Sequence, residues 1–322
     1  GAHANGCADD TGPDRYARMV LTTEVGGWGA NGKRPAGNGS PPGEKEVFGL
    51  KLASFDLISD THLDFWLDKG EDVDPFVDAL LPEQPSKALV IAGDLGHYNE
   101  MNYNFLRSVR RYYGDVLIVA GNHDYYLIDS RERWKHRTDS IRRWTNMKAL
   151  ASMVEGVRYL EGNIVEIDGV RFGGTGMWYD FSYGVQALGF SLHKMFDEWE
   201  SRMNDSALIF GPPRRPLEWY DRERTRLDRI VPDCDVIVTH VGPDWSQIAD
   251  DRRFDPLSGC YYFDGSAFMD VLAGKIWCFG HTHQRIRYER GGCRFVSQAL
   301  GYPDEQDDLP PYGMATVRLE SE

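Results

Sequence analysis

Five short polar segments, each placed where an apolar run ends, constrain the fold of this chain more than any other feature. They are Asp60-Thr61-His62, Gly93-Asp94, Gly121-Asn122-His123-Asp124, Thr239-His240 and Gly280-His281-Thr282-His283. The runs before them, such as FDLIS and VLIVA, are typical of buried strands. Loops at the carboxyl ends of strands in α/β sheets are where ligands bind. We therefore expect side chains from five distant parts of the sequence to converge on one crevice.

From Lys51 onward the chain alternates strand-like and helix-like segments. Short apolar runs predict strands at 52–59, 87–93, 115–121, 233–240, 275–280, 293–300 and 313–321, and two or three more within 158–176 around an Asp168-Gly169 turn. Apolar residues at helical spacing predict helices at 74–83, 103–114, 140–154, 185–203, 217–230 and 266–274. The first of these helices is expected to use Asp74 as its N-cap. The pattern predicts one α/β domain over residues 51–322, with sheets inside and helices outside.

Residues 1–50 have a different composition from the rest of the chain. The stretch GGWGANGKRPAGNGSPPGEKE is rich in Gly, Pro and Asn and predicts an N-terminal extension or linker. No apolar run reaches the roughly 18 residues that a membrane-spanning helix needs, and the N-terminus has no apolar signal-peptide core. The five cysteines form no C-x-x-C pair and are expected to be reduced thiols. These features predict a cytoplasmic protein without a membrane partner.

The net charge of −14 bears on the class of partner. An acidic chain binds nucleic acid poorly without sequence recognition, because phosphate contacts need Lys and Arg. Nucleic acid is therefore a possible partner that the charge does not indicate. A small phosphorylated molecule or a nucleotide is not excluded, since bound cations can invert the local field.

The residue types in the five segments suit divalent metals. Carboxylate oxygens, imidazole nitrogens and an Asn carbonyl are borderline-to-hard ligands, and the segments contain no thiolate. In D-x-H and H-x-H on extended backbone, the two outer side chains point to the same side. Six of the nine histidines lie in or beside these segments. The joint pattern predicts a metal site rather than scattered surface histidines, with Mn²⁺ as the first choice and Fe, Zn²⁺, Co²⁺ or Mg²⁺ as alternatives.

These motifs resemble those of the calcineurin-like metallophosphoesterase superfamily, over residues 55–284. The family pattern D-x-H, G-D, G-N-H-[DE], H and G-H-x-H stands here as DTH, GD, GNHD, TH and GHTH. The resemblance implies a four-layer αββα sandwich of two mixed sheets flanked by helices. It also implies two metals that share one carboxylate. The first would be held by Asp60, His62, Asp94 and His283, and the second by Asp94, Asn122, His240 and His281.

A two-metal site implies a particular chemistry. Two cations about 3.5–4 Å apart clamp the attacking and leaving oxygens and produce a metal-activated hydroxide near pH ~7. The resemblance implies that His123 binds no metal and faces the substrate phosphate, where it can stabilise the transition state or protonate the leaving group. Asp124 could orient that imidazole, or it could simply stabilise the turn.

The second motif reads GDLGHY, which differs from the G-D-x-V-D-R-G of protein Ser/Thr phosphatases. His97, three residues after Asp94, is similar to a histidine of the DNA-repair nuclease branch. It could contact a phosphodiester or be an ordinary loop residue. No segment resembles the DNA-capping domain of those nucleases.

Two further segments leave alternatives open. Aromatic residues at 173–184, and Tyr125 with Tyr126, could stack a base or form a hydrophobic plug under a long loop. The basic segment 131–148 could bind a second phosphate or be a solvated helix face.

The sequence thus predicts hydrolysis of phosphate esters, and of phosphodiesters or nucleotides in particular. A phosphomonoesterase of broad range is the alternative within that class. Two hypotheses from other classes also have to be considered. One is a non-catalytic binding scaffold, and the other is a phosphoesterase whose first 50 residues bind nucleic acid or a partner.

Overall fold

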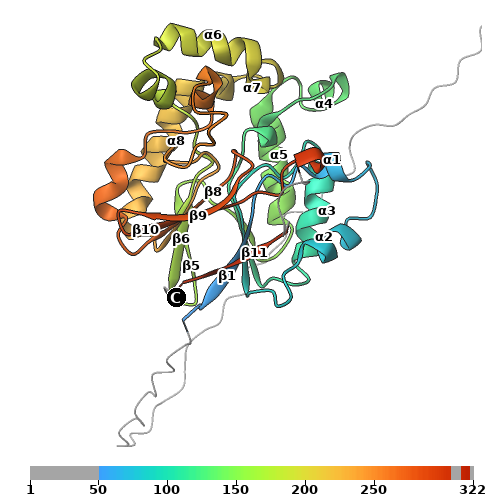
Figure 1. The fold of residues 1–322 in the computed structure, drawn as a ribbon. Coiled ribbons are helices and arrows are strands. Elements are labelled where there is room, and N and C mark those ends of the chain that lie inside the picture. Colours follow the sequence, from blue (N-terminus) through green and yellow to red (C-terminus); the bar gives the residue numbers. More distant parts are fainter. Residues whose placement is uncertain (1–50, 306–312, 320–322) are drawn as a thin grey trace, which may run out of the picture. The chain divides into compact units, whose positions relative to one another are not determined.

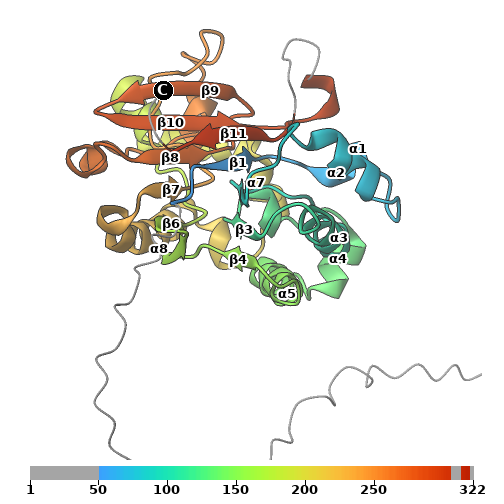
Figure 2. The ribbon, with the colours of Figure 1, turned by 90° about the horizontal axis from the view of Figure 1, so that it is seen from below.

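A computed structural model describes residues 51–305 and 313–319 of the chain (Figure 1). The predicted extension at residues 1–50 lies outside the described residues. Two mixed sheets stand face to face in the middle of the described part, and helices cover their outer faces (Figures 1 and 2). The predicted αββα sandwich is confirmed.

The first sheet contains five strands in the order β11-β1-β2-β3-β4. Their bounds are β1 Ser54–Ile58, β2 Ala88–Ile91, β3 Asp115–Ile118, β4 Val157–Tyr159 and β11 Ala315–Arg318. The strands β1 to β4 pair in parallel, and β11 pairs with β1 in antiparallel fashion. Because β1, β2 and β3 run in parallel, the loops that follow them leave the sheet at the same edge.

The second sheet contains six strands in the order β5-β6-β7-β8-β10-β9. Their bounds are β5 Asn163–Ile167, β6 Val170–Gly174, β7 Val236–Val238, β8 Ile276–Phe279, β9 Arg285–Arg290 and β10 Cys293–Gln298. Parallel pairing runs through β6, β7, β8 and β10, while β5 and β9 are antiparallel edge strands. The isolated bridge between Ser59 and Ala299 links the ends of β1 and β10.

The layer between the sheets is apolar. It contains side chains from both sheets, including Phe55 and Leu57 of β1, Val90 of β2, Phe172 of β6 and Val238 of β7. All five are fully buried, and the rings of Phe55 and Phe172 pack edge to face at 5.3 Å. Strands that are covered on both faces carry continuous apolar runs, which is why these strands were recognisable in the sequence.

The helices have the following bounds: α1 Leu63–Trp66, α2 Asp74–Leu80, α3 Asn99–Val109, α4 Ser130–Lys135, α5 Ser140–Ser152, α6 Leu192–Arg202, α7 Asn204–Leu208 and α8 Pro216–Ile230. In Figures 1 and 2, α2, α3 and α5 lie beside the first sheet and α8 beside the second. The helices α6 and α7 belong to the long connection between β6 and β7, beyond the strand ends that carry the polar motifs.

Four predicted helices differ from the structure. The helix predicted at 103–114 lies at Asn99–Val109. The segment 185–203 is a short π-helical turn, Tyr183–Ala187, followed by α6. Gly189 has a φ of 73° between them, and Ser191 caps α6 by accepting a hydrogen bond from the Lys194 amide. Residues 266–271 form a 3₁₀ helix. Asp74 is not the N-cap of α2, because that helix begins at Asp74 itself, after Val73.

Among the described residues, no helix has the length and apolar character that crossing a bilayer requires. The four described cysteines, Cys234, Cys260, Cys278 and Cys293, are free and buried. Cys7 lies outside the described residues.

Candidate metal centre

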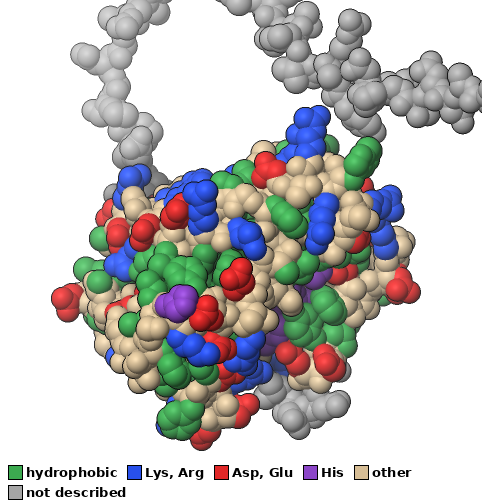
Figure 3. All heavy atoms as spheres, turned by 90° about the horizontal axis from the view of Figure 1, so that it is seen from above, with side chains coloured by type: hydrophobic (Ala, Val, Ile, Leu, Met, Phe, Trp, Pro, Cys, Tyr) green, Lys and Arg blue, Asp and Glu red, His purple; other side chains and the backbone are tan. Residues whose placement is uncertain are grey.

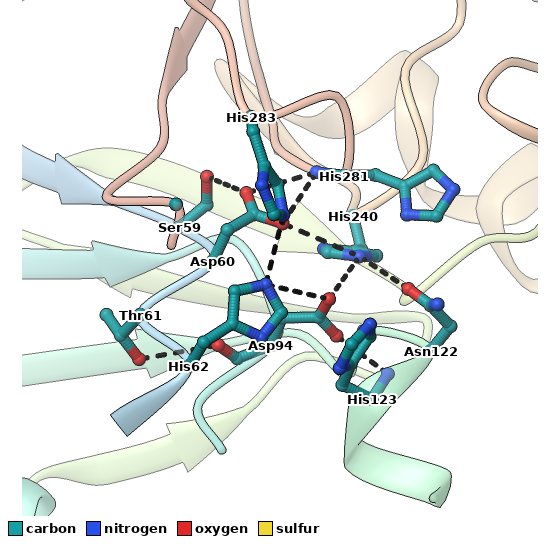
Figure 4. A network of polar contacts seen from close by, with 12 residues as sticks. Ser59, Asp60, Thr61, His62, Asp94, Asn122, His123, His240, His281 and His283 are labelled. Atoms are coloured by element: carbon teal, nitrogen blue, oxygen red, sulfur yellow. Dashed lines mark hydrogen bonds and ion pairs between the residues drawn. The ribbon is translucent and has the colours of Figure 1, made fainter. Parts of the chain in front are cut away.

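All seven predicted metal ligands lie together at the carboxyl ends of five strands (Figure 4). The loops after β1, β2 and β3 come from the first sheet, and the loops after β7 and β8 come from the second. The ligands are Asp60, His62, Asp94, Asn122, His240, His281 and His283, and we call this set the ligand floor. Six of them are buried, and the His283 side chain keeps 16% of its surface exposed.

The backbone of the ligand floor is strained. Asp60, His62, Asp94, His281 and His283 all have positive φ values, between 40° and 68°. Residues other than glycine rarely adopt this conformation, which costs on the order of 1–3 kcal/mol each. Such strain persists only where the surroundings determine the conformation, and it is often found at functional sites.

Two glycines allow the loops to approach one another. A Cβ atom at Gly280 would lie 2.6 Å from Asp60 Oδ2, and one at Gly121 would overlap the carboxylate of Asp94. Neither contact can be relieved cheaply, because both carboxylates are fixed by backbone donors. The His281 amide donates to Asp60, and the His123 amide donates to Asp94 Oδ1 at 2.9 Å. Glycine is therefore required at both positions for the carboxylates to reach the floor.

The first group of ligand atoms surrounds His62 and His283. The two Nε2 atoms are 3.0 Å apart, His283 Nε2 is 3.6 Å from Asp60 Oδ1, and His62 Nε2 is 3.8 Å from Asp94 Oδ2. Two nitrogen ligands at about 2.1 Å from one cation lie about 3.0–3.4 Å from each other. The spacing of this group fits a single divalent cation.

The second group surrounds His240. Its Nε2 lies 3.1 Å from Asn122 Oδ1 and 3.3 Å from Asp94 Oδ2, and His281 completes the group. Asp94 Oδ2 thus faces His62 on one side and His240 on the other. This is the position that a carboxylate shared by two cations would occupy.

Hydrogen bonds at the far side of three rings decide which nitrogen remains for a cation. Carbonyl and carboxylate oxygens only accept, so the ring nitrogen bonded to them carries the proton. His240 Nδ1 donates to the Ala92 carbonyl, His281 Nε2 to the Cys260 carbonyl, and His283 Nδ1 to Glu305 Oε2. The opposite nitrogen of each ring is left to face the centre, as is usual for metal-binding histidines.

The charges of the floor are unevenly distributed in the protein without cations. Burial lowers the pKa of His62 and of His281 to about 3. Burial also acts on His240, but the carboxylates of Asp94 and Asp60 outweigh it and raise its pKa to about 10. Burial alone would raise the pKa of Asp94, whereas His240 and His123 hold it well below its usual range. A protonated His240 therefore stands where a cation would compete for the same carboxylates.

His123 borders the floor, and one of its ring nitrogens lies within 4.8 Å of ligand atoms of His62 and Asp94, so these three residues form a third group of possible metal ligands. The Nδ1 of His123 is 2.9 Å from Nε2 of His97, and the Nδ1 of His97 is 2.7 Å from Asp64 Oδ2. Asp64 also accepts from the His97 amide at 2.8 Å. His97 is 4% exposed and uses both ring nitrogens inside the protein, which favours a supporting role over direct contact with a phosphodiester.

The Asp124 carboxylate forms its hydrogen bonds with backbone amides and not with the His123 imidazole, so the prediction that it orients this imidazole gains no support. Its Oδ2 accepts hydrogen bonds from the backbone amides of Gly121, at 2.7 Å, and Asp94, at 3.1 Å. Burial and the charge of Asp94 raise its pKa to about 6. Asp124 therefore stabilises its own turn and links it to the loop that carries Asp94.

The sequence patterns missed Asp205, which lies in α7. This fully buried carboxylate accepts from Asn122 Nδ2 at 2.8 Å and from Tyr126 Oη at 2.5 Å, while its other oxygen accepts from Tyr179 Oη at 2.6 Å. Because the amide NH₂ of Asn122 is held by Asp205, its Oδ1 points toward His240. No periodicity or motif distinguishes Asp205 from other acidic residues in the sequence.

Two more supporting residues were also missed. Glu305 holds His283 at 2.6 Å, and it belongs to a loop well beyond the last motif. Arg143 was counted in the basic segment 131–148, but it is fully buried and donates to the carbonyls of His123, at 2.7 Å, and Gly96, at 2.6 Å. Arg143 thereby joins the two loops that carry His123 and His97.

The structure also decides the two open alternatives. Trp178, Tyr179, Phe181 and Tyr183 are at most 4% exposed, so the stacking platform is wrong and the hydrophobic plug is correct. Tyr125 and Tyr126 are also buried, although the Tyr126 ring stacks on His123 with centroids 4.2 Å apart. In the basic segment, Lys135 and Lys148 pair with glutamates at the surface, which favours a solvated helix face.

A cleft of about 440 Å³ opens above the floor. Asp94, Asn122, His123, His281 and His283 line its inner end, and histidine side chains are visible in the hollow of this face (Figure 3). One side is formed by residues 244–262, between β7 and β8, which we call the cleft wall. Ligand pockets commonly measure about 300–1,000 Å³, so the space exceeds what one phosphate group needs.

Comparison with known proteins agrees with this geometry. The calcineurin-like phosphoesterase family matches residues 53–285, so the chain belongs to that family. An uncharacterized protein of Acanthamoeba polyphaga mimivirus is 22% identical over 275 residues, covering 81% of this chain and 95% of that protein. The crystal structure of a phosphopantetheinyl hydrolase from Mycobacterium tuberculosis superimposes with a TM-score of 0.64 at 20% identity, covering 83% of this chain and 96% of the other.

Family membership and the ligand groups identify the protein as a metal-dependent hydrolase of phosphate esters. The predicted enzyme class is confirmed, and the scaffold alternative loses its support.

Proposed function

We propose that the protein hydrolyses phosphodiesters or nucleotides with two divalent cations on the ligand floor. The observation that carries this proposal is the pair of buried ligand groups that meet at Asp94 Oδ2. Bound there, two cations would supply charge stabilisation for the phosphate oxygens and a lower pKa for water. Carboxylate, imidazole and amide ligands without thiolate suit several divalent cations, of which we take Mn²⁺ as the first candidate, with Fe, Zn²⁺, Co²⁺ or Mg²⁺ as alternatives.

The ligands divide into two sets in this proposal. Asp60, His62 and His283 hold one cation, Asn122, His240 and His281 hold the other, and Asp94 belongs to both. Glu305 and Asp205 act through the ligands that they hold. Carboxylates that orient metal ligands in this way commonly tune metal affinity.

His123 is proposed to hold the proton that the leaving group receives. Asp64 accepts from His97 Nδ1, so Nε2 of a neutral His97 is free to accept from His123 Nδ1. This arrangement fixes the His123 ring and leaves its Nε2 facing the cleft that the residue lines, where only the doubly protonated ring carries a proton for the leaving group. Burial lowers the pKa of His123 in the metal-free protein, so the negative charge of a bound phosphate would have to stabilise that form. Asp64 and His97 are positioning residues in this scheme.

Two features favour diesters over monoesters. The cleft has room for a second substituent beyond the phosphate. A monoester dianion also needs more positive charge than a diester monoanion. Of the two guanidinium groups that the described residues contribute to the cleft, Arg202 is already bound by Asp255 and Glu198, and Arg252 lies on the exposed cleft wall. The phosphomonoesterase alternative would need a further cation beside the floor.

The decisive measurement compares a diester and a monoester with the same leaving group, bis-p-nitrophenyl phosphate and p-nitrophenyl phosphate, on Mn²⁺-loaded protein. We expect a higher kcat/KM for the diester. A preference for the monoester would establish the broad phosphomonoesterase instead. Cyclic nucleotides, short DNA and RNA, and a phosphopantetheinyl ester, suggested by the name of the mycobacterial neighbour, complete the screen.

His97→Ala tests the diester preference further. If His97 orients His123 for diester cleavage, the variant should lose more activity on the diester than on the monoester. Equal losses on both substrates would make His97 a residue of general structural importance.

We also propose that residues 1–50 are an extension outside the catalytic domain and that the protein is cytoplasmic. The Gly/Pro-rich composition supports the first point, and the free, buried cysteines support the second. Limited proteolysis should remove the extension and leave an active fragment, and inactivation on trimming would contradict this division.

A further inference from the structure

The cleft wall is a built surface rather than a loose loop. Asp255 caps the turn at Leu257, with its Oδ1 accepting from the Leu257 amide at 3.0 Å, and binds Arg202 through both oxygens at 2.6 and 2.8 Å. Ser258 Oγ donates to the Arg252 carbonyl at 2.8 Å. Tyr183 Oη donates to the carbonyl of Arg253 at 2.6 Å, tying the wall to the connection between β6 and β7. The backbone of the wall is therefore held in a defined conformation at these residues.

The wall presents apolar surface near the floor and one available guanidinium. Ile248, Ala249 and Tyr261 line the cleft, together with Arg252. Tyr261 packs against the candidate ligand His281, with ring centroids 5.0 Å apart, so the apolar part of the wall begins beside the floor.

Arg252 differs from its neighbours. Its side chain is 58% exposed, and its nearest carboxylate, Asp251, is 3.9 Å from Nε, beyond hydrogen-bond distance. Arg202, also in the cleft, has three charge-assisted hydrogen bonds to Asp255 and Glu198. Among the described lining residues, Arg252 is thus the guanidinium that retains donors for a ligand. Arg253 pairs with Asp250 at 2.9 Å and does not line the cleft.

We infer that the substrate is a phosphoester whose organic substituent carries a second anionic group, a carboxylate or a phosphate, which Arg252 binds. The scissile phosphate lies on the floor, an apolar spacer crosses Ile248 and Tyr261, and the second anion meets the guanidinium. Planar guanidinium groups bind both anions in a bidentate manner. This inference rests on the proposed function and adds the class of substituent.

The test uses p-nitrophenyl phosphodiesters whose second substituent is an alkyl chain of increasing length, ending in a carboxamide or a carboxylate. The leaving group is constant, so differences report on binding of the chain. At the chain length that spans the cleft, the carboxylate should lower KM about fivefold relative to the carboxamide, as expected for a partly exposed ion pair. High salt should reduce this advantage.

Arg252→Ala should abolish the carboxylate advantage, and Arg253→Ala, the matched control on the same loop, should preserve it. The inference is overturned if the wild type shows no carboxylate advantage at any length, or if both variants lose it equally. A third series that ends in a phosphate shows, by comparison of its KM with that of the carboxylate series, which of the two anions Arg252 binds more tightly.

Binding measurements separate this inference from the proposed function. If the wild type hydrolyses none of these diesters, the proposed function fails. Calorimetric titration of the same compounds into the protein then decides the inference, because the carboxylate advantage should still appear in Kd and vanish in Arg252→Ala. An equal Kd for the two chain ends would overturn it.

Discussion

The ligand floor and the cleft wall belong to one cleft but are built in opposite ways. The floor residues follow buried strands, five of the seven have positive φ values, and partners from other loops hold them, as the His123 amide holds Asp94. The wall is one continuous segment, 244–262, and its Arg252 and Asp251 side chains are mostly exposed. The difference suggests that the chemistry is determined by the whole fold, whereas substrate choice is determined by one replaceable loop.

Removing the shared carboxylate should have the largest effect. Asp94→Ala should lose both cations, while elemental analysis of the Mn²⁺-loaded wild type should give about two per chain. Activity should fall at least about 10³-fold, since each cation provides several kcal/mol of transition-state stabilisation. Asp251→Ala, on the exposed part of the wall, is the control and should keep both cations. Full metal content in Asp94→Ala would refute the shared position.

His123→Ala should separate catalysis from metal binding on the floor itself. Loss of a proton donor typically costs about 10²–10⁴ in rate, so kcat should drop by that range while the metal content stays near that of the wild type. His193→Ala, at an exposed position on α6, should change neither quantity. If His123→Ala loses a cation instead, the residue is a ligand.

The same contrast explains what the sequence could predict. Strands buried on both faces have apolar runs, so β1, β2, β3, β7 and β8 and the ligands that follow them were recognisable. The αββα sandwich followed from the motif resemblance and agreed with that alternation. The helix break at Gly189 was missed, because helical spacing continues through 185–203 and a single glycine did not reveal the turn.

Supporting residues could not be predicted from sequence. Asp205 and Glu305 act through side-chain contacts that depend on how distant loops meet, and acidic residues are common at the surface of a chain with 50 of them. Arg143 lies in a segment rich in exposed basic residues, so its inward orientation was hidden. The proposed role of Arg252 is likewise readable only once the wall has folded against the floor.

Substitution of Asp205 therefore tests the floor more selectively than substitution of the metal ligands themselves. Asp205→Ala should weaken binding of the cation held by Asn122, His240 and His281 by about 10–100-fold, because the Asn122 amide loses the acceptor that orients it. The cation beside His62 should be bound nearly as tightly as before. Asp205→Asn keeps an acceptor oxygen and should lose less. Equal weakening of both cations would indicate general loosening of the fold, not loss of orientation.

The last effect needs no substitution: it concerns pH and follows from the charge that the floor holds without cations. A metal binds only the neutral imidazole, and the pKa of His240 in the metal-free protein is about 10. Across pH 6 to 9, each cation that binds at His240 must displace a proton from this residue, so the apparent Kd of the cation should fall by up to about tenfold per pH unit.

His240 makes the opposite contribution to folding of the metal-free protein. Its raised pKa stabilises the fold fully below the ordinary value of 6.5, and this stabilisation is lost as the pH rises through about 10.

Calorimetric titration of Mn²⁺ in buffers of different ionisation enthalpy would count the protons that are released when the cation binds. A Kd independent of pH over this range would mean that His240 is already neutral in the metal-free protein, and that its pairing with Asp94 and Asp60 is weaker than the geometry indicates. The exposed cleft wall offers the internal comparison. Binding of a carboxylate-ended diester at Arg252 should show no such dependence, because a guanidinium stays protonated throughout.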